Sequence, residues 1–407
     1  MGLESNIPKG YKQTELGIIP EDWEVRKICE GLADVKSGKR LPMGYYVTEN
    51  RTNHPYIRVI DMYDGGVNIS NLMYVPNEAY KSIEKYRIFK DDIFISVAGT
   101  LGVVGKIPKW LDGANLTENA NRLTNITCDR DYLLYYLRSP YIQNVISSEQ
   151  TIGAQPKLAL TRIRNFDIAI PGNIREQKAI AKALSDVDDL IAALDKKIAK
   201  KRLIKQGAMQ QLLTGKKRLP GFTDEWVDAE VAEICEILDN RRIPLNEEQR
   251  KKGVYPYCGA NGVVDYIDKY IFNDDLILIA EDGGNFDQFE TRPIAYWMTG
   301  KFWVNNHAHV LKASSEYCQK FIYYQLEHKD ITDYIVGGTR TKLTRAQLNC
   351  IEIKLPIAKK EQQTIATILS DMDKEITDLE TKRDKYRLLK LGMMQKLLTG
   401  QIRLNTK

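Results

Sequence analysis

The sequence predicts an α+β fold in which two mixed α/β globular domains are separated by two long antiparallel coiled-coil helices, with an internal pseudo-two-fold repeat. Three observations predict it. Residues 171–219 align without a gap to residues 356–404, at an offset of 185, with 25 identities in 49 positions. Both copies carry an apolar repeat of 3.5 residues. Each copy follows a longer segment with short β-branched runs, so the chain is two copies of one unit.

The first variable segment predicts a domain of short strands over residues 1–170. Residues 93–98 are an apolar, β-branched run between turn residues, as expected for a buried strand. Residues 131–137 predict a short helix, and residues 152–158 predict a loop.

The first shared segment, residues 171–219, predicts a long helix. Its apolar residues alternate in steps of three and four, interrupted by lysines in the middle turns, at Leu184, Val187, Ile191, Leu194, Ile198, Lys201, Lys205, Ala208 and Leu212. The helix is expected to stop at Thr214-Gly215, because glycine adopts the left-handed terminal turn easily.

The second half repeats this order. Residues 220–355 predict another mixed domain, with a strand over residues 276–280 and a helix over residues 320–326. Residues 356–407 predict the second long helix, which stops at Thr399-Gly400 and has its seam at Leu369, Met372, Ile376, Leu379, Arg383, Tyr386, Lys390, Met393 and Leu397. Roughly 40 residues at about 1.5 Å each give a rod of about 60 Å, so antiparallel pairing would place the globular domains at opposite ends.

Composition limits the class of protein. Apolar residues make up 43% and charged residues 28%, which is ordinary for a globular protein, and no apolar run approaches the roughly 18 residues of a membrane span. The N-terminal residues lack the pattern of a secretory signal, which predicts a cytoplasmic protein. Six cysteines lie far apart without a CxxC pair, which disfavours a zinc knuckle or a disulfide framework.

Motifs for catalysis are mostly missing. Residues 99–107 resemble a phosphate-binding loop but have one residue too many and end in isoleucine, and no GxGxxG follows a predicted strand. His307 and His309 alternate on a predicted strand without a ligand cluster, so they are interpreted as strand residues rather than metal ligands. We therefore expect no catalytic residue, no cofactor and no metal. A nuclease using Asp91-Asp92 or Asp274-Asp275 remains an alternative, although turn capping explains these pairs more simply.

Charge and loop composition favour recognition of nucleic acid. The net charge is only +5, but residues 171–220 carry twelve Lys and Arg against five Asp and Glu, and residues 356–407 carry eleven against seven, so the remainder is net negative. Basic and amide side chains in glycine-rich loops carry donors that match base edges. These candidate DNA-binding residues are Lys36, Ser37, Lys39, Arg40, Thr100, Gln155, Lys157, Arg241, Arg242, Asn261, Asn285, Arg340 and Lys342.

The shared segments also carry a family resemblance. Pro171 with Glu176-Gln177, Pro356 with Glu361-Gln362, the Leu-Ser-Asp-x-Asp stretches and the Leu-Leu-Thr-Gly endings resemble the specificity (S) subunit of type I restriction-modification systems. The resemblance covers nearly the whole chain. It implies that each globular domain is a target-recognition domain that reads one half of a split site in double-stranded DNA.

The resemblance also implies partners. Two methyltransferase (M) subunits would dock on the outer faces of the helices, restriction and motor (R) subunits would bring ATP and cleavage, and the helix pair would set the spacer. We then expect weak DNA binding by this chain alone and tight, salt-sensitive binding with its partners. The alternative is a coiled-coil scaffold that joins two protein-binding domains without DNA specificity.

Overall fold

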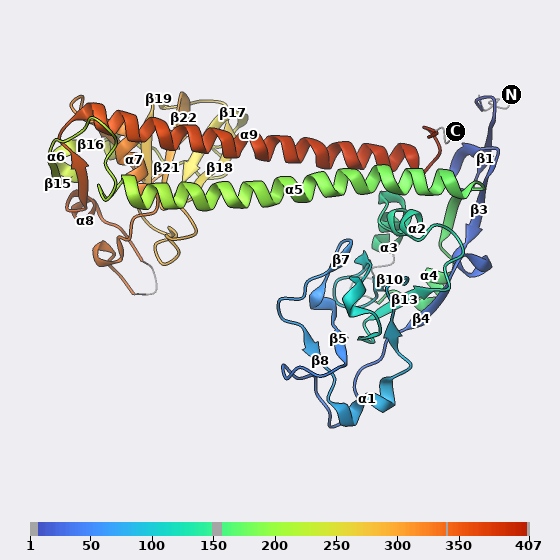
Figure 1. Cartoon of the computed structure of the whole chain (residues 1–407). Coiled ribbons are helices and arrows are strands. Elements are labelled where there is room, and N and C mark those ends of the chain that lie inside the picture. The colour runs from blue at the N-terminus through green and yellow to red at the C-terminus, as the bar shows by residue number, and fades with distance from the viewer. Residues whose placement is uncertain (1–6, 149–156, 339–340, 405–407) are drawn as a thin grey trace. The chain divides into compact units, whose positions relative to one another are not determined.

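The computed structural model describes residues 7–148, 157–338 and 341–404. The chain divides into two compact units. Unit 1 is Met1–Leu194 with Lys382–Lys407, and unit 2 is Asp195–Thr381. Both long helices, α5 (Ile174–Leu212) and α9 (Lys359–Leu397), contribute one part to each unit (Figure 1). No helix in the described part of the chain is long and apolar enough to cross a membrane.

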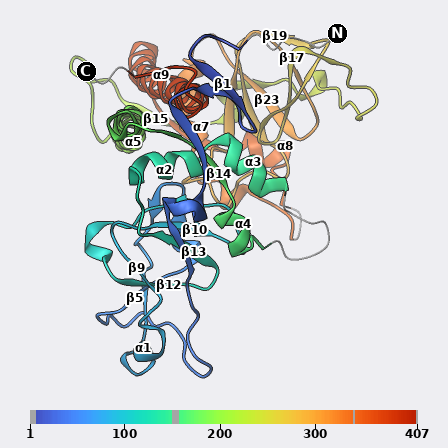
Figure 2. The same ribbon diagram turned by 90° about the vertical axis from the view of Figure 1, so that its right-hand side faces the viewer.

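Unit 1 contains two four-stranded sheets, in the orders β11-β10-β13-β4 and β8-β5-β12-β9, and three two-stranded ladders, β1-β2, β14-β3 and β6-β7. Its strands are β1 (Tyr11–Thr14), β2 (Gly17–Pro20), β3 (Trp23–Lys27), β4 (Asp34–Ser37), β5 (Pro55–Ile57), β6 (Met62–Tyr63), β7 (Gly66–Val67), β8 (Met73–Tyr74), β9 (Arg87–Ile88), β10 (Ile93–Ser96), β11 (Val104–Gly105), β12 (Ala114–Leu116), β13 (Ala120–Thr124) and β14 (Asp167–Pro171). Its helices are α1 (Asn77–Ile83), α2 (Arg130–Leu137), α3 (Pro140–Ser148) and α4 (Leu160–Arg164), with short turns at η1 (Ile28–Leu32), η2 (Val59–Asp61) and η3 (Lys109–Leu111). In Figures 1 and 2, α2 lies between α5 and the sheet that contains β10 and β13.

Unit 2 repeats this plan, with sheets in the orders β16-β23-β20-β21 and β18-β17-β22-β19 and one ladder, β15-β24. Its strands are β15 (Trp226–Glu230), β16 (Cys235–Ile237), β17 (Lys252–Gly259), β18 (Gly262–Ile267), β19 (Phe272–Asn273), β20 (Leu276–Ala280), β21 (Ala295–Met298), β22 (Lys301–Val304), β23 (Ala308–Ala313) and β24 (Glu352–Pro356). Its helices are α6 (Val231–Ile234), α7 (Gln319–Glu327) and α8 (Arg345–Asn349), with short turns at η4 (Asp239–Arg241) and η5 (Thr332–Tyr334).

The strand registers confirm the predicted repeat. In unit 1, Leu123 of β13 pairs with Ile93 of β10 and with Val35 of β4. In unit 2, Leu311 pairs with Ile277 of β20 and with Ile237 of β16. The predicted strands at residues 93–98 and 276–280 are β10 and β20, and the predicted short helices are α2 and α7. The two globular domains therefore share strand order as well as helix position.

The predicted long helices are confirmed, with ends close to those expected. Each helix ends two residues before its Thr-Gly pair, at Leu212 and Leu397. Gly215 and Gly400 have φ of 69° and 71°, the left-handed conformation that the sequence predicts for them.

Within each unit the two helices run antiparallel. In unit 2, successive basic residues along α5 and the segment after it bind acidic residues that come progressively earlier in α9. Lys201 binds Glu375, Lys205 binds Asp373, and Arg218 binds Glu361. In unit 1, Asp188 binds Lys390, and Glu176 binds Arg403.

Apolar residues of the two long helices complete the cores. Ile180, Leu184, Met394 and Leu397 are buried in the main core of unit 1. Leu212, Ile365 and Leu369 are buried in that of unit 2. At about 25 cal/mol per Å² of apolar area, this burial is a main source of stability for each unit.

The polar residues in the seams have a structural reason. Lys205 binds Asp373, whose carboxylate also accepts a hydrogen bond from Tyr324 of α7. The equivalent positions in unit 1 behave alike, since Lys390 binds Asp188, which accepts from Tyr135 of α2. These lysines thus link the helix pair to the globular domain instead of interrupting the pairing.

Candidate nucleic-acid interface

The candidate residues of the N-terminal domain meet at one end of strand β13. Ala120 begins β13 and pairs with Ser96 of β10, and its carbonyl accepts from the N–H of Gly38, just after β4. Lys36, Ser37, Lys39 and Arg40 surround Gly38 and are exposed, as is Thr100 in the turn after β10. Lys157 pairs with Ala98 and is also exposed. Gln155 lies outside the described residues.

The C-terminal domain brings its candidates to the equivalent end of strand β23. Ala308 begins β23 and pairs with Ala280 of β20. The N–H of Leu238, just before η4, donates to the carbonyl of Val310 in β23. Lys342 pairs with Asp282, as Lys157 pairs with Ala98 in the other domain. Arg241, Asn261 and Lys342 are exposed, whereas Arg242 is partly buried and Asn285 is buried. Arg340 lies outside the described residues.

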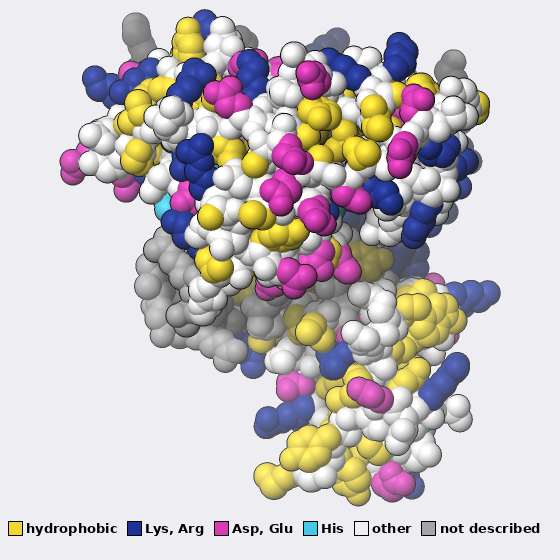
Figure 3. All heavy atoms as spheres, turned by 90° about the vertical axis from the view of Figure 1, so that its left-hand side faces the viewer, with side chains coloured by type: hydrophobic (Ala, Val, Ile, Leu, Met, Phe, Trp, Pro, Cys, Tyr) yellow, Lys and Arg dark blue, Asp and Glu magenta, His cyan; other side chains and the backbone are white. Residues whose placement is uncertain are grey.

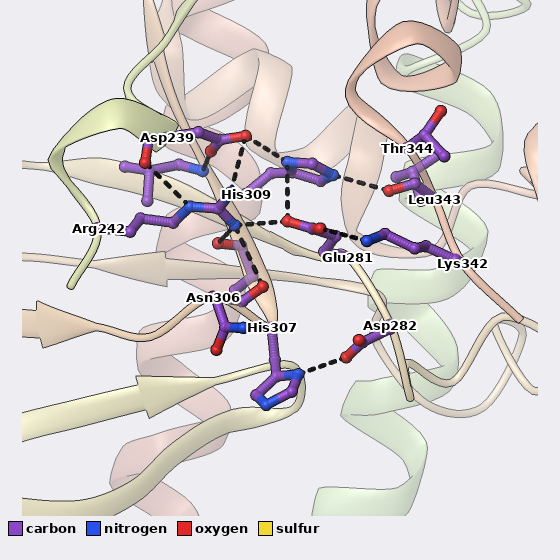
Figure 4. A network of polar contacts seen from close by, with 12 residues as sticks. Asp239, Arg242, Glu281, Asp282, Asn306, His307, His309, Lys342, Leu343 and Thr344 are labelled. Carbon is purple, nitrogen blue, oxygen red and sulfur yellow. Dashed lines mark hydrogen bonds and ion pairs between the residues drawn. The ribbon is translucent and has the colours of Figure 1, made fainter. Parts of the chain in front are cut away.

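Arg242 lies in an internal polar network, which we call the β23 network: Asp239, Arg242, Glu281, His309 and Lys342 (Figure 4). Arg242 Nη1 donates to Glu281 Oε2 over 2.6 Å and to the carbonyl of Ala308 over 2.8 Å. Lys342 Nζ lies 2.9 Å from Glu281 Oε1. The network therefore ties the loops after β16 and β20 to the segment around Lys342.

His309 lies at the centre of the β23 network and is 1% exposed. Its Nδ1 lies 2.6 Å from Asp239 Oδ2, and its Nε2 lies 2.8 Å from the carbonyl oxygen of Leu343. Both neighbours are hydrogen-bond acceptors, so both ring nitrogens are engaged within the domain. Of the two histidines predicted to be strand residues, His309 lies on β23 with its side chain buried, whereas His307 precedes β23.

The charges of the network explain its pKa shifts. Burial opposes ionisation of Asp239, but the hydrogen bond and charge of His309, the N–H of Val310 and the charge of Arg242 leave its pKa below the ordinary value. Burial likewise opposes ionisation of Glu281, and hydrogen bonds from Lys342 and Arg242 outweigh it and lower the pKa.

Asp239, Glu281 and His309 also lie close enough together to hold a cation. Each carboxylate is already bound to Arg242, and Glu281 is bound to Lys342 as well. Both ring nitrogens of His309 face acceptors, so neither offers a lone pair to a metal in this arrangement. The donor set therefore fits a structural ion-pair network better than a metal site.

Arg241 and Asn285 have different surroundings. Arg241 lies over the ring of Phe272, with its guanidinium carbon 4.6 Å from the ring centre, and remains exposed. Asn285 donates to the carbonyl of Pro293 over 3.2 Å, which fixes the turn that contains it. Arg241 therefore stays exposed at the surface, although its Nη2 also donates to the carbonyl of Ile271 over 3.3 Å, while Asn285 supports the loop.

Sequence reasoning missed a pair of arginines in the N-terminal domain. The guanidinium carbons of Arg87 and Arg122 lie 5.5 and 5.8 Å from the ring centre of Phe89. Within the described residues, Nε of both arginines and Nη1 of Arg122 have no hydrogen-bond partner. Burial lowers the pKa of Arg122, and the charge of Arg87 adds to the effect. The two lie 35 positions apart, so no local motif could reveal the pair.

Charged side chains do not form one basic field on the view of unit 2 in Figure 3, where acidic, basic and apolar side chains are interspersed. This agrees with the net negative charge of the variable segments. Contact with a polyanion would therefore depend on local groups such as those at β13 and β23.

Comparisons with known proteins agree with these features. The sequence matches the type I restriction modification DNA specificity domain twice, over residues 20–201 and 223–386. A Methanocaldococcus jannaschii protein, assigned as the specificity subunit of the type I restriction enzyme MjaX, is 26% identical over 98% of both chains. The specificity subunit of the MjaVIII enzyme from the same organism is 27% identical over 52% of this chain and 50% of that relative.

Solved structures share the fold. The S subunit of a type I restriction-modification system from M. genitalium matches with a TM-score of 0.62 at 18% identity, over 100% of this chain and 99% of that one. A second structure, from work on complex assembly and conformational transition of the type I R-M system, matches with a TM-score of 0.56 at 14% identity, over 94% and 99% of the two chains.

Proposed function

This chain belongs to the type I restriction-modification DNA specificity family, and from that membership we propose that it is the DNA sequence-recognition subunit of such a system. Each globular domain reads one half of a bipartite site in double-stranded DNA. The observation that carries this proposal is the duplicated arrangement in which exposed basic and polar side chains collect at the same end of β13 and of β23. Such side chains bind phosphates and read base edges.

The recognition residues are proposed to be those that the sequence predicts, with different roles. The exposed candidates would contact DNA; they are Lys36, Ser37, Lys39, Arg40, Thr100, Lys157, Arg241, Asn261 and Lys342. Gln155 and Arg340 lie outside the described residues and are proposed as DNA contacts on the sequence alone. Arg242 and Asn285 would instead hold the loops that carry these contacts, because Arg242 is partly buried, Asn285 is buried, and both donate within the domain.

The domain organisation proposed for this function follows the repeat. Residues 1–170 and 220–355 would be the target-recognition domains, and residues 171–219 and 356–407 would form an antiparallel coiled coil that sets the spacer between half-sites. The antiparallel ion pairs within each unit support such pairing. A helix pair of fixed length would hold the two half-sites about one or more helical turns apart.

Two equivalent apolar patches support docking of two methyltransferase subunits, one per repeat. Leu203 and Ile204 on α5 are 68% and 46% exposed. Leu388 and Leu389, their equivalents at the offset of 185, are 73% and 50% exposed. Exposed apolar side chains on an ordered helix are typical of protein interfaces. Restriction and motor subunits would join through this assembly, in the cytoplasm, and the chemistry would belong to the partners.

The decisive experiment maps DNA methylation. The chain is co-expressed with its methyltransferase subunit, and modified adenines are located across a genome by single-molecule sequencing. A split motif with a fixed spacer is expected, together with weak DNA binding by the chain alone. Exchange of residues 20–170 for the equivalent segment of a relative should change one half of the motif, whereas the alternative of a coiled-coil scaffold predicts no change.

A further inference from the structure

A cavity with several polar groups in its lining lies beside the β23 network in the C-terminal domain. It has a volume of about 410 Å³ and is lined by Gly259, Ala260, Asn261, Val264, Asp282, Gly283, Asn305, His307 and Thr341. Amide, carboxylate and imidazole groups from three separate loops meet there, together with Thr341 from a fourth segment. Cavities that bring a few polar groups together are the usual places for specific recognition.

The two histidines of this region have different surroundings. His309 is buried, and both of its ring nitrogens are bound within the domain. The side chain of His307 is 41% exposed, and among the described residues its ring has one polar partner, with Nδ1 2.5 Å from Asp282 Oδ1. Figure 4 shows the ring of His307 projecting away from the β23 network, with its other nitrogen directed away from Asp282.

His307 is held firmly despite its exposure. Its backbone N–H donates to Asn305 Oδ1 over 2.8 Å, and its carbonyl accepts from the N–H of Glu281 over 2.9 Å. Asn305 is 8% exposed, and a Cβ at Gly259 would lie 3.2 Å from Asn305 Nδ2. A fixed backbone and a fixed ring reduce the entropy lost on binding, which favours a recognition role.

We propose that His307 is a specificity-determining residue that contacts one base in the half-site read by the C-terminal domain, with Asp282 as its positioning residue. This inference rests on the proposed DNA-recognition function. Asp282 holds the ring through Nδ1, so Nε2 is the nitrogen left to bind a ligand. In the major groove Nε2 would form one hydrogen bond to a base edge, accepting from the amino group of adenine or cytosine when Nδ1 alone carries a proton.

The N-terminal domain lacks this pair. The N–H of Val97 bonds to the carbonyl of Asn119, as that of Glu281 bonds to His307, so Asn119 takes the position of His307. By the same register, Ala98 takes the position of Asp282. The proposed contact is therefore confined to the C-terminal half-site, which is a physical reason for the two domains to prefer different sequences.

The test uses the complete complex of this chain with its methyltransferase subunits. His307→Ala is compared with the unchanged chain by mapping methylated adenines across a genome. Discrimination at one base pair of the C-terminal half should fall by about 5- to 150-fold, the size of one base contact, while the N-terminal half stays unchanged. His328→Ala is the matched control, since this histidine bonds to the carbonyl of Phe289 in the same domain and should leave the motif unaltered.

Asp282→Ala separates positioning from simple loss of folding. It should relax the same base pair, and the double variant should be no worse than His307→Ala alone, because both changes remove one interaction. Copurification with the methyltransferase subunit and an intact N-terminal half report that each variant is folded.

An unchanged motif in His307→Ala, or relaxation in the N-terminal half, overturns the inference. The proposed function is judged separately, by exchange of residues 220–355. If that exchange alters the C-terminal half while His307→Ala does not, only the role of His307 is lost. If the exchange alters neither half, the recognition function itself is wrong.

Discussion

Arg403 donates to both carboxylate oxygens of Glu176, through Nε over 2.5 Å and Nη2 over 2.7 Å. Glu176 lies in the first turn of α5, and Arg403 follows the end of α9. Arg218 and Glu361 make the equivalent pair in unit 2, with both distances 2.8 Å. Each tail thus covers the first turn of the other helix, and the hydrogen bonds that Arg403 donates to Glu176 raise the pKa of the guanidinium.

Arg403→Ala is expected to destabilise unit 1. It leaves the carboxylate of Glu176, 3% exposed, without its bidentate partner, and such a loss costs about 1–3 kcal/mol when solvent can partly reach the site. Thermal unfolding of the purified chain should show a lower midpoint. Arg175→Ala, an exposed arginine one position before Glu176, should shift the midpoint little. Equal shifts for both variants would contradict this role of the pair.

Substitution of Arg241 should affect DNA binding, whereas substitution of the neighbouring Arg242 should affect stability. Arg241 is exposed, so Arg241→Ala should weaken DNA binding by the full complex about 3- to 10-fold and reduce the salt slope by about 1. Arg242→Ala should instead lower the unfolding midpoint, because it leaves Glu281 and Asp239 with fewer partners. Binding isotherms at several salt concentrations and thermal scans measure the two effects, and the reverse pattern would show that the roles are exchanged.

The β23 network should weaken in acid. The pKa of Asp239 is lowered in the folded state, so its contribution is present above the unfolded value near 4 and is lost as the pH falls below it. Asp239→Asn should cost about 2 kcal/mol at pH 7 and should make the loss of stability below about pH 4 shallower. Denaturant titrations across that range measure it. Asp224→Asn, at an exposed position, serves as the control and should keep the steep loss.

Lys320 should make stability depend on alkaline pH. Its Nζ lies 4.0 Å from the ring centre of Trp297, and burial lowers its pKa to about 8. The folded state therefore loses this proton before the unfolded chain does, so stability rises as the pH passes from about 8 toward 10.5.

Removal of the charge tests this prediction. At pH 7, Lys320→Met should raise the unfolding midpoint by about 2–4 °C, and the advantage should shrink by pH 10. Thermal scans at each pH follow the difference between the two proteins. Lys360→Met, at an exposed position, should show no such trend, and a constant advantage for Lys320→Met would refute the pKa shift as its cause.

The sequence predicted the features that depend on local pattern. The long helices were predictable because a seam repeats every few residues, and Gly215 and Gly400 were predictable as terminal turns because few other residues adopt positive φ. The order of the strands in the sheets was not predictable from the sequence. Strands that pair, such as β4 and β13, are about 85 positions apart in the chain, and their register depends on the whole sheet.

The sequence predicted which loops carry the candidate residues, but not which of these residues are exposed and which support the loop. Loop composition identifies Arg241 and Arg242 equally, and only the fold shows that one is exposed and the other binds Glu281. The repeated pairs Glu176-Gln177 and Glu361-Gln362 are visible in the sequence, but their structural role is not. Gln177 accepts from the N–H of Asp129 and donates to the carbonyl of Pro171. Gln362 makes the equivalent hydrogen bonds with Cys318 and Pro356. Each glutamine therefore connects the end of a strand to the first turn of its long helix.

The division of the chain into units has a consequence for synthesis on the ribosome. Unit 1 needs Met394, Leu397 and Leu398 to complete its core, yet these residues are translated after all of unit 2. Although domains nearest the N-terminus usually fold first, Ile180 and Leu184 must wait for the last part of the chain. Unit 2, one continuous stretch, can finish folding earlier, so the nascent N-terminal half exposes apolar surface longest and is the part most in need of a chaperone.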